Sequence, residues 1–197
     1  MDVSPAGPLV VAMLSIFLFA TLCACLVLTV VSLRKPAVPM MSIAGTLLVL
    51  ATILAAISPV DVPALWGIAI AMVGIAVAVL GGNPATRLVL ELATGGRVRE
   101  TPDGGILIAS SRPKADADGL EPLLRGGTTI GYLERLAVAV AIIAGYPEAI
   151  AVVVAIKGIG RFSELAEAEA RERFIIGTFA SLVWACVAGA LVRLAIW

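Results

Sequence analysis

The chain has 197 residues, of which 60% are hydrophobic and only 14% are charged, against roughly 45–50% apolar and ~25% charged in soluble domains. Its fourteen basic and fourteen acidic residues cancel, which argues against nucleic acid as a partner, and the lack of histidine removes the commonest general base. Because a membrane-spanning helix needs about 20 apolar residues, we predict an all-α membrane protein, a polytopic bundle of about six transmembrane helices.

Three apolar segments, residues 8–33, 40–57 and 64–81, precede a central connector. The first has no basic residue before it and ends at an Arg-Lys pair. This charge order is typical of a first membrane helix with its N-terminus outside, rather than of a cleavable signal. The third segment ends at Gly81-Gly82, which we interpret as a helix stop because glycine weakens helices and is favoured just beyond their C-terminal ends.

The central connector, residues 83–127, is much more polar than the segments around it. It begins with Asn-Pro, which suits the start of a helix, so we predict a short interfacial helix over 83–94. A Pro-Asp-Gly turn between two short runs predicts a small β-hairpin over 97–109. Lysines and arginines concentrate here and in the loops on the same side, which predicts a cytoplasmic connector with both termini outside.

The pattern of residues 128–197 predicts a helical hairpin followed by a long last helix. The hairpin consists of segments 128–144 and 148–161, joined by a Gly-Tyr-Pro turn, and the last helix covers 163–196. The first turns of that helix alternate Glu with Arg and Ala, which is typical of a solvated helix face rather than of a metal site. We therefore predict neither a metal site nor a bound cofactor.

Two opposite charges lie at matching positions in the two arms of the hairpin. Glu134 is twelve residues before Tyr146 at the turn, and Lys157 is eleven residues after it. At 1.5 Å per helical residue both lie ~17 Å from the turn, so we expect the two side chains at nearly the same depth, where they can form a pair.

Two arginines accompany this pair. Arg135 points to a different side of its helix from its neighbour, because adjacent helical residues do not share a face, and we expect it to reach toward Glu164 or Glu172. Arg161 lies one turn beyond the lysine, where it is positioned to hold the start of the last helix.

Together, Glu134, Arg135, Lys157 and Arg161 form a candidate intramembrane charged site with two open interpretations. Ionisable residues inside a membrane are costly and are functional candidates by default, which favours a site for a proton, an ion or an anionic headgroup. Acids and bases in matching numbers can also neutralise one another in a lattice that fixes the hairpin register, and we favour this interpretation. No residue is assigned a catalytic role.

Small residues predict close helix packing. They recur at every fourth position of the last helix: Gly177, Ser181, Ala185 and Gly189. Such a stripe lets another helix approach closely, and Ala20 with Ala24 gives the first segment a similar face. The three cysteines all lie in apolar segments, which indicates packing residues rather than disulfides or metal ligands.

Five short motifs in the last third of the chain are similar to a known family: Ile130-Gly131-x-Leu133-Glu134-Arg135, Ala149-Ile150, Ala155-x-Lys157, Arg161-Phe162 and Glu172-x-Phe174-x-Ile176-Gly177-Thr178. They resemble the C-terminal block of a bacterial integral-membrane family, a domain of unknown function. The resemblance covers about residues 126–190. Members of that family often carry a first segment with His and Asp, to which this chain has nothing similar. The resemblance implies a recurring module of hairpin plus helix and implies no activity.

The sequence favours a non-catalytic membrane protein: a small subunit, scaffold or accessory factor that contacts membrane lipids and joins a homo-oligomer or a larger membrane complex. The alternative is a small transporter or ion-conducting protein that uses the charged hairpin. An enzyme acting on lipid at the cytoplasmic face ranks third, because no acid–base constellation is recognisable. The Ala/Val/Gly-rich composition is compatible with a high-GC bacterium, so we predict a multi-pass protein of the bacterial plasma membrane.

Overall fold

The computed structural model describes residues 7–34, 38–58, 62–94, 127–160 and 168–197. Over these residues the chain forms six helices and no strand: α1 (Pro8–Arg34), α2 (Val38–Ile57), α3 (Ala64–Thr94), α4 (Gly127–Ile143), α5 (Ala149–Gly160) and α6 (Ala168–Ile196). The β-hairpin predicted over 97–109 and the predicted first residues of the last helix, 163–167, lie outside the described residues.

Four of the helices, α1, α2, α3 and α6, are long and apolar enough to cross a membrane. They have 27, 20, 31 and 29 residues, and at 1.5 Å per residue each reaches at least ~30 Å, the thickness of a hydrocarbon core. α4 and α5 are shorter, with 17 and 12 residues. The described chain is therefore all-helical, with four helices of spanning length, which suggests a location in a membrane.

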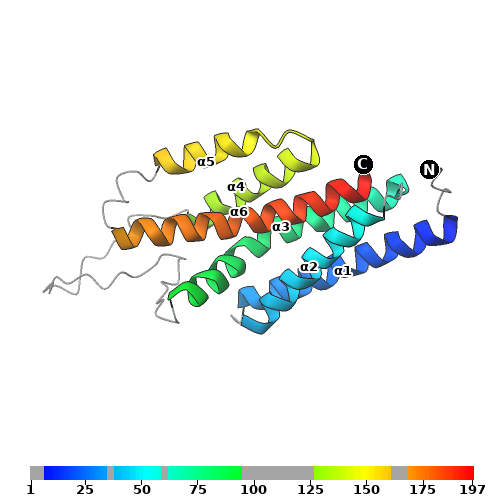
Figure 1. Cartoon of the computed structure of the whole chain (residues 1–197), viewed down its shortest axis with the longest axis horizontal. Coiled ribbons are helices and arrows are strands. Elements are labelled where there is room, and N and C mark those ends of the chain that lie inside the picture. Colours follow the sequence, from blue (N-terminus) through cyan, green and yellow to red (C-terminus); the bar gives the residue numbers. More distant parts are fainter. Residues whose placement is uncertain (1–6, 35–37, 59–61, 95–126, 161–167) are drawn as a thin grey trace, which may run out of the picture.

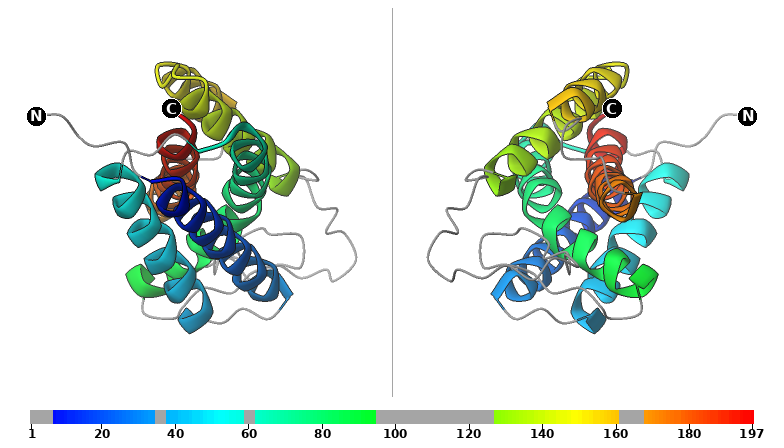
Figure 2. Two further views of the ribbon diagram at one scale, coloured as in Figure 1. Left: turned by 90° about the vertical axis from the view of Figure 1, so that its right-hand side faces the viewer. Right: turned by 90° about the vertical axis from the view of Figure 1, so that its left-hand side faces the viewer.

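α3 and α6 form the centre of the bundle, and α6 contacts α2, α3 and α4. α1 and α2 pack together on one side of this central pair, and the α4–α5 hairpin lies on the other side (Figure 1). The view along the helices shows α5 outermost, resting on α4 (Figure 2). The last turn of α3 and the first turns of α4 and α6 lie at one end of the bundle, which we call the connector end.

The buried face of α1 differs from the prediction. Its core residues include Leu18, Leu22 and Cys25, which are at most 1% exposed, whereas Ala20 and Ala24 are exposed. The expectation that the two alanines form the packing face of this helix is therefore wrong for the contacts within the chain. Burying the leucines gives more van der Waals contact than burying alanines, and such contact drives helix association in lipid.

The predicted helix stop at Gly81-Gly82 is also wrong, as is the separate helix predicted over 83–94, because one helix continues to Thr94 with Pro84 inside it. Glycine costs about 1 kcal/mol and proline about 3 kcal/mol in a helix interior, so local propensity alone predicts a break here. Contacts from neighbouring helices override that propensity, as they commonly do for glycine and proline in membrane helices.

Candidate functional site

The two arms of the hairpin are joined by an ion pair. The ammonium group of Lys157 on α5 donates a hydrogen bond to the carboxylate of Glu134 on α4, and the two side chains are 20% and 12% exposed. The sequence predicts the same depth for these two residues, and the structure brings their side chains into contact. Because α5 packs mainly on α4, this pair fixes the register of the outer helix on the inner one.

The turn of the hairpin is held by the end of α6. The Nη1 atom of Arg193 donates to the carbonyl oxygens of Ile143 and Ile142, at 3.2 Å and 3.4 Å, and so caps the C-terminal end of α4. Gly145 turns the chain with a left-handed φ of 78°, and a Cβ there would lie 2.6 Å from the same Arg193 atom. The turn of the hairpin is therefore level with the last turns of α6.

Arg135 lies inside the bundle and is only 3% exposed. Its Nε atom donates to the carbonyl oxygen of Val79 on α3 at 2.7 Å, and its Nη1 atom donates to the Ser181 hydroxyl on α6 at 3.0 Å. The guanidinium group also lies over the ring of Tyr132, 5.2 Å from the ring centroid. One arginine thus connects α3, α4 and α6.

These contacts correct the prediction for Arg135. Its hydrogen bonds go to α3 and to a hydroxyl of α6 rather than to Glu172, and Glu164 lies outside the described residues. The reason is the position of the side chain, which enters the bundle beside α3 instead of running along the membrane boundary. Arg161, the fourth residue of the predicted charged site, also lies outside the described residues.

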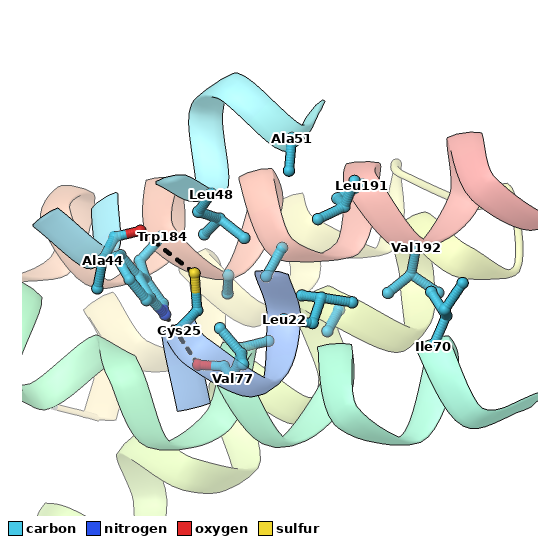
Figure 3. Packing of buried hydrophobic residues seen from close by; sticks show 14 of the residues in the cluster. Leu22, Cys25, Ala44, Leu48, Ala51, Ile70, Val77, Trp184, Leu191 and Val192 are labelled. Atoms are coloured by element: carbon cyan, nitrogen blue, oxygen red, sulfur yellow. Dashed lines mark hydrogen bonds between the residues drawn. The ribbon is translucent and has the colours of Figure 1, made fainter. Parts of the chain in front are cut away.

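A second large side chain docks on the same stretch of α3. The indole Nε1 atom of Trp184 on α6 donates to the carbonyl oxygen of Val77 at 2.9 Å (Figure 3). Trp184 lies beside Gly81 and Arg135 lies beside Gly82, so closely that a Cβ at either glycine would collide with its neighbour. We call Gly81 and Gly82 the glycine notch, because their missing side chains make room for the indole and the guanidinium.

The stripe of Gly177, Ser181, Ala185 and Gly189 is used within the chain. The hydroxyl of Thr86 on α3 donates to the carbonyl oxygen of Gly177 at 3.2 Å, and a Cβ at Gly189 would lie 3.3 Å from backbone atoms of α4. Ser181 accepts the hydrogen bond from the buried arginine, and Ala185 is fully buried. The close packing that the small residues predict therefore occurs against α3 and α4 of the same chain.

Some of the residues that build this site were missing from the prediction. Trp184 and Arg193 lie in an apolar segment and look like ordinary span and boundary residues. A usable signal exists for Trp184, because membrane tryptophans concentrate at the interfaces and a buried indole N–H needs an acceptor. A tryptophan in the middle of a span, together with a glycine pair in another, indicates a docked indole.

No family model matches this chain, and neither a curated protein nor a solved structure shows significant similarity to it. The chemistry of the site is therefore argued from its own residues. In the part of the chain that the structure describes, no three His, Cys, Asp or Glu side chains gather as metal ligands. The arrangement instead offers one ion pair between two helices and one buried arginine that binds two neighbouring helices.

Proposed function

We propose that this chain is a non-catalytic subunit, scaffold or accessory factor of a membrane complex, and that α5 packs against a transmembrane helix of a partner protein. The observation that carries the proposal is the exposure of α5. This helix is apolar, and none of its described residues, Ala149–Gly160, is buried.

The outward face of α5 is shaped for close helix contact. Ala151 and Ala155 are exposed four residues apart, and a Cβ at Gly158 would meet no atom within 4 Å. Val152 and Ile159 lie beside them and are 59% and 78% exposed. Small residues spaced in this way allow two helix backbones to approach each other in lipid, and flanking β-branched side chains supply the contact area.

The charged residues support this role because, in the described contacts, they join the helices of the chain to one another. Glu134 and Lys157 neutralise each other across the hairpin, which sets how α5 is rotated on α4. Arg135 anchors α4 to α3 and α6. The hairpin is therefore a preorganised element that presents one defined face to the lipid, as a docking surface requires.

We further propose six crossings in a bacterial plasma membrane, with both termini outside and residues 95–126 in the cytoplasm. The distribution of Lys and Arg supports this orientation. The hydrogen bonds from Arg193 to the end of α4 support the number of crossings, because they place the hairpin turn level with the far end of α6. The predicted result is that a reporter active only in the cytoplasm gives no signal when fused to the C-terminus. Strong signal from that fusion would contradict the topology.

The docking proposal predicts the effect of a bulky residue on α5. The wild-type protein, extracted from its native membranes with the surrounding lipid, is expected to carry a stoichiometric partner. Ala155→Trp is expected to reduce that partner at least tenfold, because an indole holds the two helices apart. Ala20→Trp, on the exposed face of α1, is the matched control and is expected to keep the partner. If only Ala20→Trp loses the partner, the interface lies on α1 instead. If the purified protein is a dimer of this chain with no other protein, the partner is a second copy.

A small transporter or ion-conducting protein remains the second candidate, and one observation favours it. The Nη2 atom of Arg135 is buried and has no hydrogen-bond partner among the described residues. Buried ionisable groups with unused donors are typical of ion or proton pathways. Purified protein that moves ions into liposomes, and loses this activity in Glu134→Gln, would support this candidate over the scaffold.

A further inference from the structure

A large groove lies between α2 and α6 at the connector end of the bundle, away from the α4–α5 hairpin. Its volume is about 800 Å³. One wall is the first part of α2, the other wall is the middle of α6, and the floor includes Ala85 and Leu88 of α3 with Trp184. Phe179 and Val183 at its edge are 63% and 57% exposed, so the groove opens sideways toward the membrane.

The side-chain hydrogen-bond donors of the lining are already used within the chain. The hydroxyl of Ser42 donates to the carbonyl oxygen of Val38, and the hydroxyl of Thr46 donates to the carbonyl oxygen of Ser42. The indole N–H of Trp184 is already bound to α3. The remaining lining side chains are apolar. An occupant of the groove is therefore held mainly by shape and van der Waals contact, which suits hydrocarbon.

The dimensions of the groove match a lipid chain. Its lining extends from Ile175 to Val187 on α6 and from Met41 to Leu50 on α2. At 1.5 Å per residue these walls are ~18 Å and ~14 Å long, close to half of a ~30 Å hydrocarbon core, which is the depth of one leaflet.

The shape of the groove favours an acyl chain over a helix as its occupant. α2 crosses α6 obliquely, so the two helices diverge toward the connector end (Figure 1). Leu48, a lining residue on α2, is only 2% exposed and lies toward the narrow end. A rigid helix about 10 Å wide cannot enter the narrow end of such a taper, whereas a flexible acyl chain can follow it.

We propose that this groove binds one acyl chain of a membrane phospholipid, in the leaflet at the connector end. The headgroup then lies near the start of α6, where Arg171 and Arg173 flank Glu172. Glu169 lies in the same first turns of α6, so two acids and two bases cancel there. The specificity for a lipid therefore comes from the acyl chain that enters the groove rather than from the charge of the headgroup.

The test uses the full chain in phosphatidylcholine vesicles that contain a phospholipid with a photoactivatable diazirine halfway along one acyl chain. After irradiation, labelled peptides are mapped by mass spectrometry. Labelling at Phe179 and Val183 is expected to exceed labelling at Val27 at least threefold. Val27 is a suitable reference because it is 61% exposed, close to the two groove residues, and lies in the half of α1 nearer the connector end.

A matched pair of variants sharpens this test. Gly45→Leu fills the groove, since a Cβ there would make ordinary contact with Trp184 at 3.8 Å, and it is expected to reduce groove labelling to the level of Val27. Gly158→Leu, in open space on α5, is expected to leave the labelling unchanged. Wild-type labelling at Phe179 equal to or below that at Val27 would overturn the proposal. This comparison holds even if Gly45→Leu fails to fold.

Discussion

Gly81→Ala is expected to lower the free energy of unfolding by about 3 kcal/mol, the upper range for overpacking a tight interior. The added Cβ would overlap ring atoms of Trp184, which is only 7% exposed and is held by its hydrogen bond to Val77. The rigid indole can move only by separating α6 from α3, and it then loses that hydrogen bond. Unfolding in mixed micelles with increasing denaturing detergent measures the change.

The control for this prediction is Gly158→Ala on α5. A Cβ at that position meets no atom within 4 Å, and alanine is about 1 kcal/mol better than glycine inside a helix. The same substitution is thus expected to have opposite signs at the two sites. If Gly81→Ala is neutral or stabilising, the glycine notch does not hold Trp184 and the continuous α3 needs another cause.

The second large effect concerns the ion pair. Glu134→Gln and Lys157→Gln are each expected to destabilise the folded protein by about 2 kcal/mol, because each leaves the opposite charge without its partner. The value lies below that of a fully buried pair because the side chains are 12% and 20% exposed. The double variant is expected to recover most of the loss, since neither charge remains.

The control for these single and double variants is a charge outside the ion pair. Glu148→Gln removes an exposed charge near the hairpin turn and is expected to change stability by less than about 0.5 kcal/mol. Additive losses in the double variant would show that each residue contributes separately, so the pair would not act as a structural lattice. If the single variants are as stable as the wild-type protein but no longer move ions into liposomes, the transporter is favoured.

Regular geometry made part of this site predictable from sequence. The meeting of Glu134 and Lys157 follows from counting residues from the turn, because a helix rises by a constant 1.5 Å per residue. The class and the helical segments follow from the long apolar runs. These features depend on local sequence and on the bilayer, and they need no knowledge of which helices are neighbours.

The remaining features depend on tertiary neighbours. The glycine pair and Pro84 favour a helix break locally, whereas Trp184 and Arg135 of other helices dock on this stretch of the continuous α3. The partners of Arg135 belong to α3 and α6, which are distant in sequence. The sequence does not indicate which helices lie beside Arg135, so the prediction falls on two acids of the last segment, Glu164 and Glu172, instead.

The most direct test of the proposed function leaves the protein in its native membrane. A photo-crosslinking amino acid replaces Ala155 on α5 in one variant and Ala20 on α1 in another, both at exposed positions. We predict that irradiation gives a discrete protein adduct from position 155 and only lipid adducts from position 20. Lipid adducts alone at both positions would contradict the docking of α5 on a partner helix.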